Sequence, residues 1–320
     1  YCGVGCGIIA KVRDDNIIAV EGDPSHPANR GKLCVKGTTL PQTQDAPSRL
    51  LHPEVNGQSV SWDEAISTVA SEFKETIEKH GPDSVALYLS GQLLTEDYYV
   101  ANKLMKGFIG SANVDTNSRL CMSSAVAAYK RAFGEDVVPC EYQDFEQAEL
   151  FVFVGSNAAW THPVIYQQIA AERERGAKVI VIDPRRTATC DIADLYLPIL
   201  PGGDVALFNG LLTYIAMHGY LNQSYIEAHT NGFDDALGRG DISVAEVAAV
   251  TGIQERLITR FYEDFCRTEK VLTLFSQGVN QSADGTDKGN AIINCHLATG
   301  RIGTAGAGPF SLTGQPNAMR

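Results

Sequence analysis

Three cysteines near the start of the 320-residue chain are spaced as ligands of one inorganic centre. Cys2 and Cys6 are separated by Gly3-Val4-Gly5, and Cys34 follows 28 positions after Cys6. Thiolates arranged in this way bind either an iron–sulfur cluster or zinc, because both accept sulfur ligands in a tetrahedral array. Three thiolates are one short of the usual four. The spacing therefore leaves open both a redox centre and a zinc-binding module without catalytic activity.

The other five of the eight cysteines are scattered through the rest of the chain. This density is far below that of a disulfide-stapled domain, so the default for each is a small buried apolar side chain. Cys121 differs from the others because it directly precedes a helix predicted over residues 122–133. A helix N-terminus lowers the pKa of a thiol, which favours the thiolate that a metal binds.

The cysteines are expected to be positioned by a fold in which strands and helices alternate regularly. After a helix predicted to begin at Ser61 and end before Gly81-Pro82, strands alternate with helices to the end of the chain. The predicted strands are 84–89, 149–154, 178–182, 195–199 and 271–275, and the further helices are 96–109, 122–133, 162–175, 204–217, 254–266 and 290–297. Such alternation predicts a mostly parallel sheet with helices on both faces.

Polar loops, all but one of which contain glycine, follow the predicted strands. They comprise residues 90–92, 155–157, 183–187, 201–204 and 277–281. Ligands of open α/β sheets bind at the carboxyl ends of the strands, so five such loops predict a large polar ligand. The sequence has no G-x-G-x-x-G motif, and this argues against an ordinary nucleotide-binding dehydrogenase.

Composition excludes several broad classes. The formal net charge of -12 argues against a nucleic-acid-binding protein or a protein that binds anionic membranes. No apolar run reaches the roughly 20 residues of a membrane span. An anionic substrate would therefore need a local positive group to attract it.

Several motifs identify a family resemblance. Tyr1-Cys2-Gly3-Val4-Gly5-Cys6-Gly7, Gly22-Asp23-Pro24 and Cys34-Val35-Lys36-Gly37 resemble the cluster segment of molybdopterin oxidoreductases. That family includes bacterial nitrate reductases and formate dehydrogenases, and its motif is C-x-x-C-x-x-x-C followed by C-x-K-G. Its first cysteine would lie two residues before Tyr1. We therefore expect a chain that is truncated at both ends, since family members also continue beyond the matching segment 306–315.

The resemblance implies an α/β fold in which a small N-terminal iron–sulfur β subdomain precedes α/β domains with a mostly parallel, Rossmann-like sheet. The implied limits are 1–47 for the cluster subdomain, 48–110 for a first α/β region and 111–320 for a molybdopterin-dinucleotide-binding region. The implied cofactors are a 4Fe–4S cluster and molybdenum bis(molybdopterin guanine dinucleotide).

The resemblance also implies roles for individual residues. Cys2, Cys6 and Cys34 correspond to cluster ligands, and Lys36 to a cationic electron relay between cluster and pterin. The residues implied to hold the dinucleotide are Gln92, Asn117, Gly155, Ser156, Asn157, Thr161, Asp183, Arg185, Arg186, Thr187, Gly202, Gly203, Asp204, Gln277 and Gln281.

The segment 115–125 carries the closest likeness, and it resembles the assimilatory nitrate reductases of the family. It implies that Cys121 ligates molybdenum and that Arg119 attracts an oxyanion. Formate dehydrogenases place a histidine directly after the metal ligand, whereas this chain has Met122, which cannot act as an acid or base.

The expected function is therefore molybdenum-dependent reduction of nitrate to nitrite by oxygen-atom transfer, with electrons entering through the 4Fe–4S cluster. The expected partners are nitrate and an electron donor such as a flavoprotein subunit, ferredoxin or flavodoxin. The expected location is the cytoplasm. Formate dehydrogenase and periplasmic nitrate reductase remain the alternatives within the family.

Overall fold

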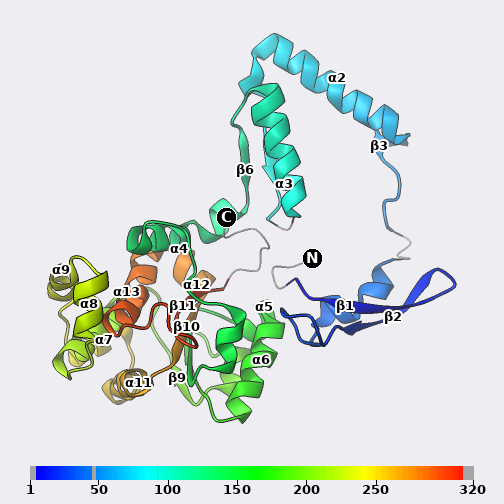
Figure 1. The fold of residues 1–320 in the computed structure, drawn as a ribbon. Coiled ribbons are helices and arrows are strands. Elements are labelled where there is room, and N and C mark those ends of the chain that lie inside the picture. The colour runs from blue at the N-terminus through cyan, green and yellow to red at the C-terminus, as the bar shows by residue number, and fades with distance from the viewer. Residues whose placement is uncertain (1–4, 45–47, 92, 313–320) are drawn as a thin grey trace. The chain divides into compact units, whose positions relative to one another are not determined.

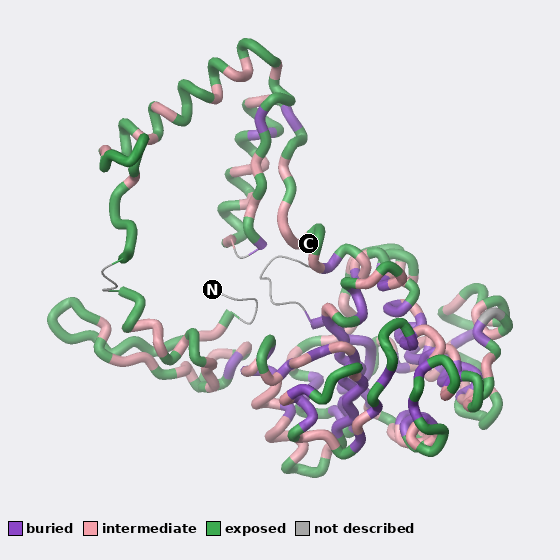
Figure 2. Tube along the Cα trace, turned by 180° about the vertical axis from the view of Figure 1, so that it is seen from behind, coloured by how far each residue is buried: buried purple, intermediate pink, exposed green. Residues whose placement is uncertain are grey.

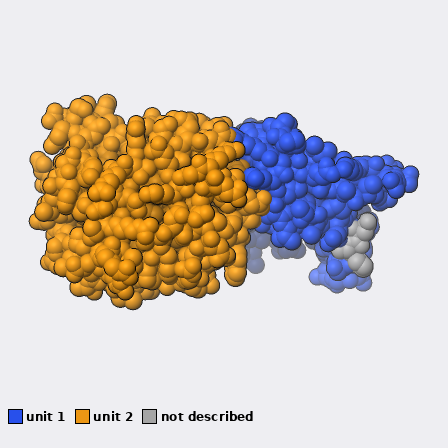
Figure 3. Space-filling model, turned by 90° about the horizontal axis from the view of Figure 1, so that it is seen from below, with its two compact units in different colours: residues 1–120, 315–317 blue, residues 121–314, 318–320 orange. Residues whose placement is uncertain are grey.

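A computed structural model describes residues 5–44, 48–91 and 93–312 (Figure 1). The chain forms two compact units, one made mainly of residues 1–120 and the other mainly of residues 121–314 (Figure 3). The predicted limits of the cluster subdomain (1–47), the first α/β region (48–110) and the dinucleotide-binding region (111–320) stay predictions.

The larger unit is built on a five-stranded sheet in the order β11-β10-β7-β8-β9. All four neighbouring pairs run parallel. The strands are β7 (Leu150–Val154), β8 (Lys178–Ile182), β9 (Leu195–Leu197), β10 (Val271–Phe275) and β11 (Gly308–Ser311). The structure confirms the predicted parallel sheet, and β11 is an edge strand that the sequence analysis did not predict.

Both faces of this sheet are covered. In β7, Leu150, Val152 and Val154 enter one apolar core, and Phe151 and Phe153 enter the other. The first core contains side chains of α4 (Ser118–Phe133), α7 (Asp204–Met217), α11 (Glu255–Arg267) and α13 (Gly285–Ala298), and the second those of α6 (Pro163–Glu174). The central strands are accordingly buried along their length (Figure 2). This two-sided burial explains why they read as continuous apolar runs.

The strand order reverses at the centre of the sheet. From β7 the chain passes through α6 to β8 and then β9, but β10 pairs on the opposite side of β7. The chain leaves β7 towards α6 on one face, and it leaves β10 through α12 (Gln277–Asn280) towards α13 on the other. Open α/β sheets bind their ligands at such a reversal.

All five helices predicted for this unit are present, although α13 begins at Gly285, five residues before its predicted start. α4 begins at Ser118, so Cys121 lies inside its first turn and not before residue 122 as predicted. Besides the four-residue helices α5 (Ala158–Thr161) and α12, the sequence analysis did not predict α8 (Gln223–His229), α9 (Phe233–Arg239) and α10 (Val244–Thr251). The last three span only seven or eight residues each, which is too short to show a clear helical period in the sequence.

The smaller unit begins with an antiparallel hairpin of β1 (Ile8–Arg13) and β2 (Asn16–Gly22). Asp14 and Asp15 both have positive φ angles, 51° and 62°, as the tight turn of a hairpin requires. A short helix, α1 (Val35–Thr38), starts directly after Cys34, and η1 (Leu40–Thr43) follows it. A second small hairpin pairs β3 (Glu54–Val55) with β4 (Gln58–Ser59).

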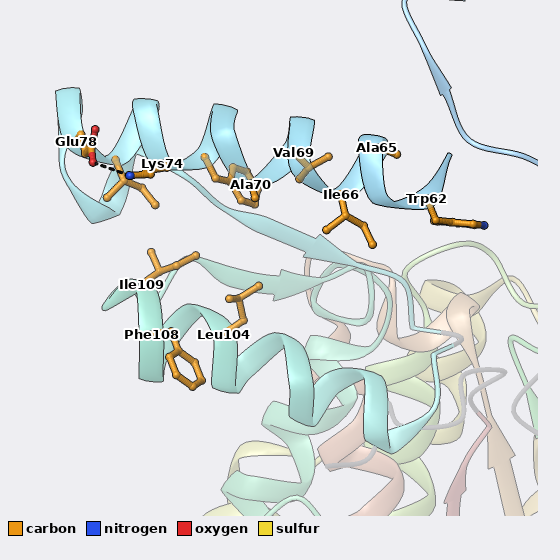
Figure 4. Close-up of a pocket in the computed structure, with 12 residues that line it drawn as sticks. Trp62, Ala65, Ile66, Val69, Ala70, Lys74, Glu78, Leu104, Phe108 and Ile109 are labelled. Atoms are coloured by element: carbon orange, nitrogen blue, oxygen red, sulfur yellow. Dashed lines mark ion pairs between the residues drawn. The ribbon is translucent and has the colours of Figure 1, made fainter. Parts of the chain in front are cut away.

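The rest of this unit contains α2 (Trp62–His80), η2 (Pro82–Ser84), α3 (Thr95–Asn102) and a π-helical continuation, η3 (Lys103–Ile109). β5 (Leu87–Leu89) pairs in parallel with β6 (Val114–Thr116). The predicted start of α2 is confirmed, because the Ser61 side chain accepts a hydrogen bond from the Glu64 amide. Apolar side chains of α2 and η3 face a groove of about 720 Å³ (Figure 4). Trp62 and Ile66 of α2 remain more than half exposed there.

A buried ion pair joins two helices of the larger unit. Lys288 of α13 lies 2.9 Å from Asp204, the first residue of α7, and both side chains are at most 10% exposed. Burial alone would lower the pKa of Lys288, but the hydrogen bond and charge of Asp204, together with Asp284, raise it. The ammonium therefore stays charged and compensates a buried carboxylate.

We predict that Lys288→Met lowers the free energy of unfolding by about 3–5 kcal/mol, because Asp204 is left buried without a counter-charge. Urea unfolding at pH 7 measures this. The ion pair's contribution is complete below the ordinary lysine pKa of about 10.4 and is lost as pH rises through the higher folded value. The matched control is Lys178→Met, since Asp264 keeps Arg260 as a second partner at 3.7 Å. An equal effect of both variants would contradict the prediction.

Candidate functional site

The segments that carry Cys6 and Cys34 are held together by one buried side chain, Asn29. Its Oδ1 accepts a hydrogen bond from the Gly7 amide at 2.8 Å, and its Nδ2 donates to the carbonyls of Gly7 and Lys32 at 3.1 and 2.8 Å. Asn29 is fully buried. It therefore links the backbone next to Cys6 to the backbone that precedes Cys34. The sequence analysis missed it, because a single asparagine in a turn-rich stretch gives no signal of its own.

Cys6, Cys34 and Lys36 share a small cavity of about 120 Å³, whose other lining residues are Ile8, Leu33, Gly37 and Leu40. Partial burial alone would raise the pKa of Cys34. The amides of Gly37 and Lys36 and the charge of Lys36 outweigh this, and the pKa of Cys34 is lowered. A thiol that ionises readily, beside a cation and backbone amides, suits a ligand of an iron–sulfur cluster.

The scattered cysteines have the opposite character. Burial raises the pKa of Cys140, Cys190 and Cys295, and it raises that of Cys266 to about 12. These thiols stay protonated and pack as apolar side chains. Cys2 lies outside the described residues, and within the described part of the chain no three His, Cys, Asp or Glu side chains gather as a metal site.

In the larger unit, the loops that follow β7 and β10 touch through their backbones. Gly278 donates its amide hydrogen to the Gly155 carbonyl at 3.0 Å. A Cβ added to Gly278 would lie 2.6 Å from the Gly155 Cα, and Gly155 has a φ of +55°. Only glycine fits at such a crossing. The contact holds the two loops against each other at the reversal of the strand order.

Two buried polar atoms at this reversal have no hydrogen-bond partner among the described residues. They are Oγ of Ser156, directly after Gly155, and Oδ1 of Asn280 in α12. Buried polar atoms are usually satisfied, and an unsatisfied one at a ligand-binding position points to a missing polar group. The residues present thus fit a large polar ligand at the carboxyl ends of β7 and β10.

The loops after β8 and β9 contribute charged residues to the same edge. The pKa of Asp183 is raised, mainly because the carboxyl group is partly buried and also because of the charge of Asp204. The backbone hydrogen bond and the charge of Arg185 oppose this shift. The Asp183 carboxylate accepts a hydrogen bond from the Arg185 amide at 2.9 Å, and Arg186 lies over the Tyr196 ring. Asp183, Arg185 and Asp204 therefore follow strands whose carboxyl ends share one edge, although Asp204 is already paired with Lys288.

The remaining predicted residues of these loops are also placed. Asn157 accepts a hydrogen bond from Thr189, and Thr161 donates to the Asn157 carbonyl. Thr187 and Gly203 are buried, whereas Gly202 and Gln281 are exposed. Their contacts with a dinucleotide stay predictions.

Cys121 lies within reach of the turn that follows β10. Gln277 Nε2 donates to Cys121 Sγ at 3.5 Å, and Asn280 Nδ2 donates to the Cys121 carbonyl at 2.5 Å. Asn280 Nδ2 also lies 3.6 Å from the sulfur of Met122. These contacts place the thiol beside the loops at the reversal, as a ligand to a metal bound there would require.

Asn117 and Lys36 belong to the smaller unit, and Arg119 lies in the first turn of α4, where the chain passes from the smaller unit to the larger one. Asn117 accepts a hydrogen bond from the Gly91 amide at 2.6 Å, which joins the loops after β5 and β6. Arg119 forms an exposed ion pair with Asp115 at 3.5 Å. Lys36 is exposed beside Cys34. Gln92 lies outside the described residues.

Comparison with known proteins identifies the family to which the chain belongs. Residues 49–320 match the family described as molybdopterin oxidoreductase, and residues 1–46 match the molybdopterin oxidoreductase Fe4S4 domain. The chain belongs to the molybdopterin oxidoreductase family. This membership supports a molybdenum–pterin cofactor and a 4Fe–4S cluster, and it argues against the zinc-binding module.

Individual proteins that resemble this chain are consistent with this membership. The chain is 55% identical to a nitrate reductase of Klebsiella oxytoca, covering all of this chain and 37% of that protein. It is 40% identical to a periplasmic nitrate reductase of Desulfovibrio desulfuricans, covering 99% of this chain and 44% of that one. Acetylene hydratase from Pelobacter acetylenicus has the same fold, with a TM-score of 0.80 at 22% identity over 96% of this chain and 43% of that one. The chain thus spans less than half the length of each of these proteins.

We predict that Asn29→Ala impairs cluster retention in the full-length molybdopterin oxidoreductase, because the Cys6 and Cys34 segments lose their common hydrogen-bonding partner. Iron content per chain and the cluster's electron paramagnetic resonance signal should both fall towards those of Cys34→Ala. Asn16→Ala, at the exposed first residue of β2 in the same unit, is the matched control and should retain its iron. Full iron content in Asn29→Ala would show that the link is dispensable.

Proposed function

We propose that the intact protein to which this chain belongs reduces nitrate to nitrite. The observation that carries the proposal is the position of Cys121 beside the strand-order reversal, in contact with Gln277 and Asn280. The similarity to a nitrate reductase at 55% identity supports the same substrate. When bound, the molybdenum–pterin cofactor supplies oxygen-atom transfer coupled to two electrons.

The chain's own residues would hold and orient this cofactor. We propose that Cys121 provides a thiolate ligand to molybdenum, since a soft sulfur donor suits a metal already held by dithiolenes. Ser156 and Asn280, each with an unsatisfied buried oxygen, would accept hydrogen bonds from the pterin dinucleotide, for which we propose the guanine form. Cys6 and Cys34, with Cys2, would hold the cluster.

Arg119 keeps its predicted role within this proposal. Its ion pair with Asp115 is exposed, and exposed pairs contribute at most about 1 kcal/mol. The guanidinium can therefore exchange Asp115 for an incoming anion at little cost. We propose that Arg119 supplies the local positive group that the net charge of -12 makes necessary.

We further propose the assimilatory type, a cytoplasmic location, and a flavoprotein subunit, ferredoxin or flavodoxin as donor. The amino-acid sequence of segment 115–125 supports the assimilatory type. Within the part of the chain that the structure describes, no helix has the length and apolar character needed to cross a membrane. Periplasmic nitrate reductase is the second candidate, because a periplasmic enzyme is 40% identical to this chain.

The choice of nitrate over formate is testable. The intact enzyme should reduce nitrate with an artificial one-electron donor and oxidise formate poorly, because Met122 cannot take up the substrate proton. Cys121→Ala should abolish nitrate reduction while the 4Fe–4S signal persists. Cys190→Ala, which removes a buried thiol of the same unit, is the control for loss of any cysteine. Strong formate oxidation without nitrate reduction would overturn the assignment.

Lys36 provides a separate test of electron delivery. The variant Lys36→Met should slow reduction of the molybdenum centre by reduced donor, because a fixed cation that stabilises added electrons is lost. Molybdenum and iron contents should match those of the wild type. Lys32→Met, in the same segment, controls for a general loss of positive charge. Unchanged reduction rates in stopped-flow measurements would remove Lys36 from the relay.

A further inference from the structure

Gln277 contacts the sulfur of Cys121 across a separation of 156 positions in the sequence. Its Nε2 lies 3.5 Å from Sγ, and the donor belongs to the first residue of α12, directly after β10. The neighbouring Asn280 holds the Cys121 carbonyl from the same turn. One side chain of the turn thus fixes the backbone of Cys121, and another reaches its thiol.

In the structure the Gln277 amide is oriented with its oxygen towards the Ser276 hydroxyl. The Ser276 hydroxyl donates to Gln277 Oε1, and this leaves the NH₂ group of the amide directed at the sulfur. Ser276 is 2% exposed, and its second possible acceptor is the Leu312 carbonyl at 3.2 Å. In the flipped orientation, Oε1 of the amide would face the sulfur. Because an amide oxygen only accepts hydrogen bonds, that orientation would require a protonated thiol as the donor. The arrangement with Ser276 as donor suits a deprotonated sulfur.

We propose that Gln277 is a positioning residue that donates a hydrogen bond to the Cys121 thiolate, and so raises the reduction potential of the metal that this sulfur ligates. The inference rests on the proposed function, in which Cys121 ligates molybdenum. A hydrogen bond to a ligating sulfur withdraws electron density from it, and this favours the more reduced metal. Ser276 keeps the donor aimed at the sulfur.

The test is a potentiometric titration of the molybdenum electron paramagnetic resonance signal in the intact enzyme. In Gln277→Leu the midpoint potential should shift to a lower value, because the donor is lost. Gln277→Glu keeps the shape of the side chain and should shift it further in the same direction, since a carboxylate cannot donate and adds negative charge. Ser276→Ala should give a smaller shift of the same sign. Gln223→Leu, on the exposed start of α8, is the control and should leave the potential unchanged.

The outcomes separate this inference from the proposed function. Molybdenum content and circular dichroism establish that each variant is folded and loaded, and Gln277→Glu serves if Gln277→Leu does not fold. A Cys121→Ser variant with an altered molybdenum signal, together with unchanged potentials in both Gln277 variants, overturns the role of Gln277 and leaves the ligand assignment intact. A molybdenum signal unchanged by Cys121→Ser overturns both.

Discussion

The central strands β7 and β10 are sealed by apolar side chains on both faces, and this constraint determines where chemistry can occur. Neither face of the sheet can accept a polar ligand without breaking a core. Polar groups can converge only where the strands end. The strand order reverses between these same two strands, so the loops that follow them diverge to opposite faces and leave their first residues beside one another.

The distribution of ionisable groups follows from the same constraint. Arg301 is 6% exposed and bonded to the carbonyls of Phe265, Thr268 and Glu269, and burial lowers its pKa to about 10. Lys288 neutralises Asp204. The charges of these two buried side chains are thus used in contacts that stabilise the fold. Arg119 and Lys36, for which we propose roles towards the substrate and in electron delivery, are by contrast exposed.

The sequence predicted those features that depend on local pattern. Helix α7 and strand β10 have their predicted limits, because an apolar run bounded by polar residues marks both. The short helices α8 to α10 lack such a run. Contacts between distant segments had no local signal: the link from Asn29 to Gly7, and that from Gln277 to Cys121, arise only when the chain is folded. Arg119 was expected near an oxyanion, but its ion pair with Asp115 depends on the helical turn that begins α4 three residues before Cys121.

The glycine crossing of Gly155 and Gly278 sets a limit on how this protein can diverge or be redesigned. Each residue excludes a methyl group from the other, so a substitution at one cannot be compensated by a substitution at the other. The pair forms a fixed backbone contact between the two loops. Segments on either side, such as residues 158–161 and 281–284, could be exchanged to accommodate a different ligand, provided that both glycines are retained. New substrate or cofactor specificity in this scaffold must therefore be introduced around the crossing, not through it.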